Sequence, residues 1–216
     1  YSSVSNFGKY KIADIGSVNG DRISCIELKT NSNSTLQLLT YGCTLRYAGR
    51  SRSYVLNYDT LNEYIQNYHY LGSIIGRFCN RISPVSINSA NSITPNDINT
   101  QIALHGGYSG FNQRIWNIKS IESDAKTQSI GVTLEYTSSH GEQGFSGTVC
   151  TCAKFSICDV VLSEPGFELE YEFQTQLLNA DFVPYSYANL TWHPYFNLCA
   201  AMHRNVNSLL YLEMES

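Results

Sequence analysis

The feature that most constrains the fold of this chain is an alternation of apolar and polar residues with a period of two. It runs through Asp21–Leu28, Gly131–Thr137, Thr148–Cys158 and Phe167–Leu177. Successive side chains of a β-strand point to opposite faces, so this period predicts strands with one buried face. Long stretches with the 3.6-residue period of a helix are missing, and only Leu61–Tyr64 favours a short helix. The sequence therefore predicts an all-β protein.

Shorter segments strengthen this prediction. Tyr10–Ile15, Leu36–Tyr41, Cys43–Ala48 and Tyr185–Thr191 are also strand-like, and Gly42 allows a bend between the second and third of them. We find no repeat, low-complexity segment or linker. One domain over residues 1–216 is the simplest organisation.

Composition excludes several classes of function. Of the 216 residues, 43% are hydrophobic and 15% are charged, with a net charge of -4. Such a chain can bury a large core but has no basic footprint for nucleic acid or an anionic membrane. No apolar run approaches the roughly 20 residues of a membrane-spanning helix. These features are typical of a globular protein that acts on a small molecule.

The cysteines argue for a reducing compartment. There are seven, an odd number without a regular framework, which favours free thiols and a cytoplasmic location. Cys150 and Cys152, with Cys158 nearby, lack the matching pair of a zinc motif, and on a strand the first two would simply share one face. The sequence therefore predicts no metal site.

Asn189–Leu198 places a histidine, His193, among aromatic and apolar residues without a formal charge. Imidazole is the one side chain whose ordinary pKa suits acid and base work near neutral pH. The same pattern also fits a buried core histidine with a hydrogen-bond partner. This stretch by itself leaves both interpretations open.

Two arginines four residues apart, Arg77 and Arg81, flank Asn80 in Gly72–Ile82. The guanidinium group is a rigid fork of donors that suits an oxygen-rich ligand, and it serves equally to hold neighbouring loops in place. The residues alone do not decide between these roles.

A second histidine, His105, opens the glycine-rich and aromatic segment Leu104–Trp116. Glycine lets the backbone approach a ligand closely, and exposed aromatic rings suit the apolar face of a sugar. A glycine-rich turn packed by Trp116 is the alternative. Glu142, in the loop Gly141–Gly147, is a further candidate to face a sugar.

Taken together, these blocks resemble the aldose 1-epimerase (galactose mutarotase) family. The resemblance rests on four blocks in the same order, with Gly141–Gly147 as a weaker fifth, and it covers nearly the whole chain. The four are Val55–Tyr64, Gly76–Ile82, Leu104–Trp116 and Asn189–Leu198.

The resemblance implies a large antiparallel β-sandwich with a sugar cleft and no metal or organic cofactor. It implies interconversion of the α and β anomers of a free hexose. His193 takes the position of the general acid at the ring oxygen, and His105 that of the histidine that binds and polarises the sugar. Asn80 and Arg81 take the positions of the sugar-binding pair.

The sequence also departs from the family pattern. The family's base is a glutamate far toward the C-terminus, preceded by a sugar-binding aspartate, whereas Glu213 and Glu215 follow His193 too closely to match it. We therefore expect an incomplete C-terminal part, with a further segment or partner chain that completes the fold.

The alternative to an enzyme is a non-catalytic carbohydrate-binding or sugar-sensing protein on the same scaffold. A relative that acts on hexose 6-phosphates is a third option. With 14 Lys and Arg residues and no surplus cluster of them, the chain does not favour it.

Overall fold

The structure is a computed structural model, and it describes residues 2–5, 7–83, 93–96, 99–161, 165–178 and 185–198. Strands dominate these ranges, which confirms the prediction of an all-β fold. Among the described residues, no helix is long and apolar enough to cross a membrane.

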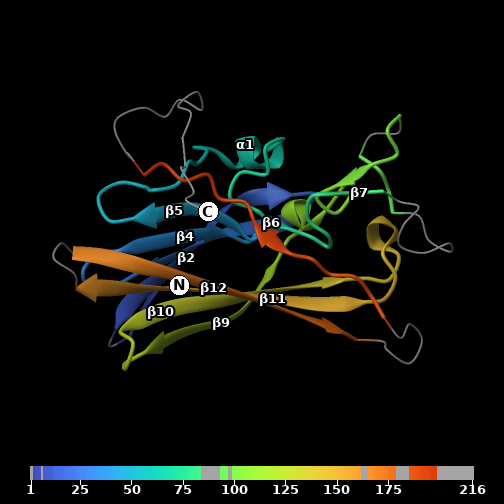
Figure 1. Cartoon of the computed structure of the whole chain (residues 1–216). Helices are drawn as coiled ribbons and strands as arrows, with labels where there is room; N and C mark the ends of the chain where they lie inside the picture. The colour runs from blue at the N-terminus through green and yellow to red at the C-terminus, as the bar shows by residue number, and fades with distance from the viewer. Residues whose placement is uncertain are drawn as a thin grey trace, which may run out of the picture.

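Two antiparallel sheets form the body of the molecule. The first has the order β1-β2-β3-β4-β5 and the second the order β12-β11-β10-β9. Their strands are β1 (Ser2–Ser5), β2 (Gly8–Val18), β3 (Asp21–Lys29), β4 (Thr35–Leu39), β5 (Thr44–Gly49), β9 (Asn117–Asp124), β10 (Ser129–Ser138), β11 (Val149–Val161) and β12 (Pro165–Leu177). In Figure 1 the blue first sheet lies over the yellow-to-orange second sheet. The antiparallel sandwich implied by the resemblance is therefore confirmed.

The main core lies between these two sheets. Fully buried apolar side chains from both sheets meet in one cluster. From the first sheet they include Ile26, Leu28, Leu36 and Leu38, and from the second Val132, Leu134, Phe155 and Ile157. Burial of apolar surface on this scale is the main stabilising contribution to a fold of this kind.

Strand β11 shows how the period of two produces this arrangement. Its odd-numbered residues from Val149 to Ile157 are buried, whereas the even-numbered residues between them are partly or fully exposed. Thr151 is the one polar member of the buried row, and its hydroxyl lies 3.0 Å from that of Thr175 on β12. The inward face of β11 is thus core, and its outward face is available to solvent.

A half-buried carboxylate connects the two sheets at one end. Asp159 of β11 accepts hydrogen bonds from the hydroxyls of Thr30 and Ser34, and its Oδ1 lies 3.2 Å from Nη2 of Arg50. Burial by itself raises the pKa of Asp159, but hydrogen bonds, those from Ser34 and Thr30 first, outweigh it and hold the pKa at about 2. The contact ties the loop between β3 and β4 to the second sheet.

Short elements fill the remainder of the described chain. Two small sheets pair β6 (Ile74–Ile75) with β13 (Thr191–Trp192) and β7 (Arg81–Ile82) with β8 (Ala103–Leu104). The predicted short helix is confirmed as α1 (Leu61–Ile65), which Thr60 and Glu63 cap reciprocally. Two 3-10 helices, η2 (Phe111–Gln113) and η3 (Glu142–Gly144), complete the set.

The prediction of a strand over Tyr185–Thr191 is wrong. In this stretch only Thr191 belongs to a strand, β13, and Asn189 forms an isolated bridge with Phe78. The segment pairs residue by residue with short pieces of Gly72–Cys79 instead of with a long strand. Alternation shows that a segment has two faces, but a regular ladder also needs a long partner beside it.

Candidate active site

Both predicted histidines lie in one cluster of rings. The ring centroids of His105 and His193 are 5.4 Å apart, and the rings are nearly perpendicular. Tyr70 packs on both, with centroids 4.6 Å from His105 and 6.1 Å from His193, and Tyr195 lies 5.3 Å from His193. The structure thus brings together two imidazoles that are 88 residues apart in the sequence.

His193 is held by the pairing of β13 with β6. Its N–H donates to the carbonyl of Ser73 (3.0 Å), and its carbonyl accepts from the N–H of Gly72 (2.8 Å). The preceding residue, Trp192, is buried against Phe155 of the core and donates its indole N–H to Gly72. Because Trp192 is fixed in the core, it also fixes the position of the neighbouring His193.

His105 is held by Asn80. The two residues exchange a pair of hydrogen bonds: the N–H of His105 donates to the carbonyl of Asn80, and the N–H of Asn80 donates to Nδ1 of His105, both at 3.1 Å. Because Nδ1 accepts, the proton of the neutral ring lies on Nε2. His105 therefore presents an N–H donor to any ligand beside it.

The turn after His105 needs a glycine. A Cβ on Gly106 would lie 1.8 Å from the carbonyl oxygen of Gly76, and its φ of +91° is rarely adopted by other residues. Without that side chain, the backbone that follows His105 approaches the Gly76 backbone closely. The glycine-rich pattern predicted in the sequence thus serves backbone packing beside the candidate site.

The segment Gly72–Arg81 connects the two histidines. The backbone of His193 forms hydrogen bonds with Gly72 and Ser73 at the start of this segment, and the backbone of His105 forms one with Asn80 near its end. Between these points the carbonyl of Gly76 accepts from Phe111, and Asn189 exchanges backbone hydrogen bonds with Arg77 and Cys79. The relative position of the imidazoles therefore depends on how this one segment is fixed.

Arg77 fixes the segment from within the protein. Its side chain is buried, and Nη1 donates to the carbonyls of Ser146 and Gly147 at 2.9 and 2.8 Å. Nε and Nη2 donate to Ser138 and Ser139. Burial lowers the pKa of Arg77 to about 10, which leaves it charged at neutral pH. Of the two roles considered for the arginines, Arg77 has the structural one.

Arg81 and Asn80 are exposed at the end of the same segment. Within the described ranges, the guanidinium of Arg81 forms no hydrogen bond or ion pair, although its charge acts on His105. Oδ1 of Asn80 accepts from the N–H of Arg81 at 2.8 Å. Both residues of the predicted binding pair therefore lie beside His105, with the guanidinium available to a ligand.

Glu142 does not face outward as a sugar ligand would require. Its carboxylate accepts hydrogen bonds from the hydroxyls of Tyr136 and Ser138 and lies 2.9 Å from Nε of Arg114. Its charge also acts on Arg77. The expectation that Glu142 faces a sugar is wrong because the carboxylate pairs with Arg114 and the hydroxyls of Tyr136 and Ser138 instead.

The aromatic residues of Leu104–Trp116 fall into buried and exposed ones. Phe111 and Trp116 are buried and pack on each other with centroids 5.7 Å apart, so they belong to the core. Only Tyr108 of that segment is strongly exposed. Tyr70, which lies outside that segment, is the aromatic ring that packs on His105.

The sequence model of the family described as aldose 1-epimerase matches residues 24–216. This chain belongs to the aldose 1-epimerase family. The ordered motifs that first suggested the resemblance are thereby supported.

Individual relatives show the extent of the similarity. The chain is 28% identical over 179 residues to the galactose mutarotase of Homo sapiens, covering 80% of this chain and 47% of that protein. It is 28% identical over 202 residues to a probable aldose 1-epimerase of Arthroderma benhamiae, covering 86% and 44%. The chain thus spans about half the length of these relatives.

Solved structures support the fold. The crystal structure of galactose 1-epimerase from Lactobacillus acidophilus superposes with a TM-score of 0.71 at 18% identity, covering 88% of this chain and 54% of that one. An aldose epimerase homologue from C. elegans gives a TM-score of 0.55 at 20% identity, covering 88% and 51%. The sandwich of this family member is therefore shared with proteins of low sequence identity.

The electrostatics of the two imidazoles follow from their burial. Burial is the first cause that lowers the pKa of His105 to about 4, with further contributions from His193 and Arg81. Burial also lowers the pKa of His193. None of the ion pairs among the described residues joins a carboxylate to either ring. Burial therefore favours the neutral form of both imidazoles.

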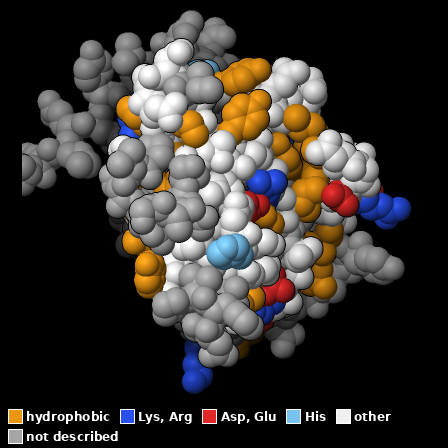
Figure 2. All heavy atoms as spheres, turned by 90° about the vertical axis from the view of Figure 1, so that its right-hand side faces the viewer, with side chains coloured by type: hydrophobic (Ala, Val, Ile, Leu, Met, Phe, Trp, Pro, Cys, Tyr) orange, Lys and Arg blue, Asp and Glu red, His pale blue; other side chains and the backbone are white. Residues whose placement is uncertain are grey.

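The surface at the loop end of the sandwich carries few charges. Figure 2 shows this side of the molecule, which is the right-hand side of Figure 1 where β7 lies. Lys, Arg, Asp and Glu side chains are scattered over it, and hydrophobic side chains gather along one margin. Among the described residues drawn in this view, the cationic side chains stand apart from one another, so they form no cluster that would bind a phosphate group.

The contrast between the two arginines is testable. Arg77→Leu removes a buried charge and leaves several carbonyls without donors, so it should lower the free energy of unfolding by about 3–5 kcal/mol. Arg81→Leu is the matched control from the same motif and should change it by no more than about 0.5 kcal/mol. Urea denaturation followed by tryptophan fluorescence measures both. Equal effects would contradict the division of roles.

The neutral state of His105 predicts a pH dependence of stability. Its folded-state pKa of about 4 lies below the unfolded value near 6.5, so protons bind preferentially to the unfolded chain. This contribution is fully present above about pH 6.5 and is lost as the pH falls toward about 4. An NMR titration should show His105 titrating well below a free imidazole.

The variant His105→Asn isolates this effect. Asparagine tolerates the positive φ of 55° at this position and offers an oxygen to the N–H of Asn80. Its urea midpoint should fall less than that of the parent protein between about pH 7 and about pH 4.5. Parallel curves for the two proteins would show that His105 is not the responsible group.

Proposed function

We propose that this chain carries the sugar site of an aldose 1-epimerase, which interconverts the α and β anomers of a free hexose such as galactose or glucose. The observation that supports it most is the convergence of His105 and His193, with centroids 5.4 Å apart, beside Asn80 and Arg81. Membership of the aldose 1-epimerase family supports the reaction class. The names of the relatives supply galactose as a substrate to test.

The reaction requires an acid and a base on opposite sides of one bond. The base takes the proton of the anomeric hydroxyl, the bond between C1 and the ring oxygen breaks, and the ring oxygen takes a proton from the acid. The product is the open-chain aldehyde. Rotation about the C1–C2 bond presents the other face of the carbonyl, and closure reverses both proton transfers.

In this proposal His193 is the acid that protonates the ring oxygen. Burial lowers its pKa in the chain by itself, so the imidazolium form needs a nearby negative charge. A carboxylate base on the other side of the sugar supplies that charge. The two groups then exchange roles between opening and closure, which requires both to titrate near neutral pH.

His105 has a different task in the proposal. Its Nδ1 is occupied by the N–H of Asn80, and its low pKa keeps it neutral, so it donates a hydrogen bond from Nε2 to a sugar oxygen. Arg81 and Asn80 bind neighbouring hydroxyls. An uncharged polyol is recognised by several such directional hydrogen bonds.

We further propose that the base is a carboxylate outside the described residues. Within the described part of the chain, no Asp or Glu forms an ion pair with His105 or His193. The cysteines remain our reason to expect this activity in the cytoplasm.

The proposal predicts a large kinetic effect at His193. In the complete protein, His193→Ala should slow mutarotation of galactose or glucose by about 10²- to 10⁴-fold, because a proton-transfer group is lost. His105→Asn should mainly weaken the sugar affinity and so raise KM. Polarimetry of freshly dissolved α-anomer measures both.

His140→Asn is the control for these variants. His140 lies in the loop before β11, where its Nδ1 accepts from the N–H of Gly147 at 3.0 Å, and asparagine retains an acceptor there. Its activity should equal that of the parent protein. Full activity in His193→Ala would remove His193 from the mechanism. A complete protein that binds hexose without accelerating mutarotation would instead be a sugar-binding protein on this scaffold.

A further inference from the structure

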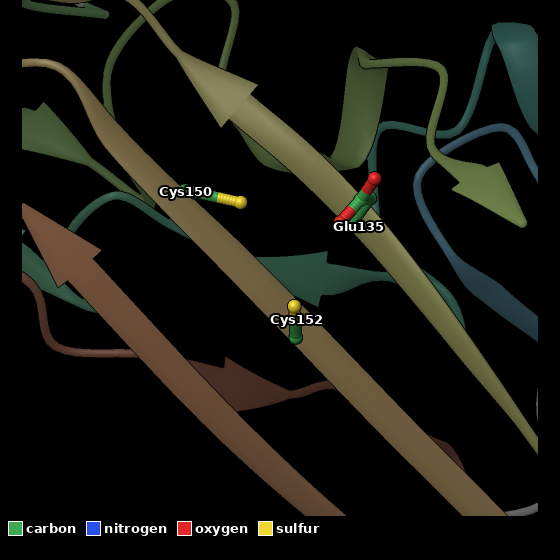
Figure 3. A group of neighbouring side chains, drawn as sticks. All are labelled: Glu135, Cys150 and Cys152. Carbon is green, nitrogen blue, oxygen red and sulfur yellow. The ribbon is translucent and has the colours of Figure 1, made fainter. Parts of the chain in front are cut away.

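The outward face of the second sheet carries a group of three metal-ligating side chains. Cys150 and Cys152 are two apart on β11, and Glu135 of β10 stands directly opposite Cys152 in the antiparallel register. One carboxylate oxygen and the two sulfur atoms all lie within 4.8 Å of one another. Figure 3 shows the three side chains on these neighbouring strands.

This group is separate from the candidate active site. Ala153 and Phe155, which alternate with these cysteines on β11, point into the core, and Trp192 packs on Phe155 from the inward side. The cysteines therefore face away from the segment that carries His193. All three members are half-buried, so an ion from solvent can reach them.

We propose that Glu135, Cys150 and Cys152 bind a thiophilic divalent cation, with Zn²⁺ as the best fit. Zinc takes thiolate sulfur at about 2.3 Å and carboxylate oxygen at about 2.0–2.2 Å, so its tetrahedral ligands lie about 3.5–3.8 Å apart. The present separations need to contract by only about 1 Å, which side-chain rotation provides. Three protein ligands leave a fourth position for water or an external ligand.

Lys119 balances the charge of such a site. Its Nζ lies 3.1 Å from a carboxylate oxygen of Glu135 and 3.4 Å from the sulfur of Cys152. Two thiolates and a carboxylate carry three negative charges, whereas the cation supplies two positive ones. The ammonium group supplies the third, so the loaded site is neutral with Lys119 at its edge.

The ion must compete with protons at the thiols. Metal binding to a thiol releases its proton, so affinity should fall as the pH is lowered. The site is then loaded at neutral to alkaline pH and emptied by acid.

Cobalt substitution tests this proposal without reference to enzyme activity. Titration of the reduced 216-residue chain with Co²⁺ should give one equivalent bound and a sulfur-to-cobalt charge-transfer absorption in the near ultraviolet, which Zn²⁺ then removes. Cys150→Ser and Cys152→Ser should each weaken or abolish the band. Glu135→Gln should keep the band but weaken Co²⁺ binding by at least about 10- to 100-fold, the range found when only an outer-shell partner of a metal ligand is lost.

Cys158→Ser is the matched control. Cys158 lies on the same face of the same strand, outside the group of three, and its substitution should leave stoichiometry and band unchanged. An unchanged band in the Cys150→Ser/Cys152→Ser double variant, or the absence of any thiolate band in the parent chain, would overturn the proposal.

A second measurement needs no variant. Bound Zn²⁺ should protect Cys150 and Cys152 of the parent chain from alkylation, with the sites mapped by mass spectrometry. Cys158 should react at the same rate with and without the ion. Equal alkylation of Cys150 and Cys152 in both conditions would also refute the site, even if the serine variants failed to fold.

Discussion

The buried guanidinium of Arg77 is the interaction on which the rest of the candidate site depends. The guanidinium donates hydrogen bonds to carbonyls in two turns of the loop between β10 and β11. The backbone carbonyl of Arg77 accepts a hydrogen bond from the N–H of Asn189. A buried charge is stable only where its hydrogen bonds are complete. Arg77 therefore holds three parts of the chain that are distant in sequence at fixed positions.

The candidate site is an outcome of this arrangement. The segment Gly72–Arg81 is fixed in its middle by Arg77, and it holds His193 near one end and His105 at the other. Placing two imidazoles in a half-buried cluster with Tyr70 has an electrostatic consequence, because burial lowers the pKa of both rings. The scaffold thus places two imidazoles side by side in surroundings that favour their neutral form.

Much of the fold and part of the site could be predicted from local sequence. Alternation in β11 predicted which face is core, and the capping residues Thr60 and Glu63 fit the short helix found at Leu61. Local pattern did not reveal the roles of Arg77 and Glu142. Arg77 shares a motif with Arg81, and Glu142 lies in the loop Gly141–Gly147, so local pattern made both look like ligand-binding residues. Only their long-range contacts show that they stabilise the fold. The error at Tyr185–Thr191 has a related cause, because a strand needs a partner that local pattern does not show.

By itself, the sequence determined most of the strands, the short helix at Leu61–Ile65 and the motifs that place this chain in the aldose 1-epimerase family. These depend on side-chain period, capping and residue order, all of which are local. Tertiary structure alone decided that His105 lies against His193, that the side chain of Arg81 is exposed while that of Arg77 is buried, and that Glu135 lies beside Cys150 and Cys152. The physical reason is that these contacts join residues that are far apart in the sequence. Strand register and packing determine such contacts, and local pattern carries no information about them.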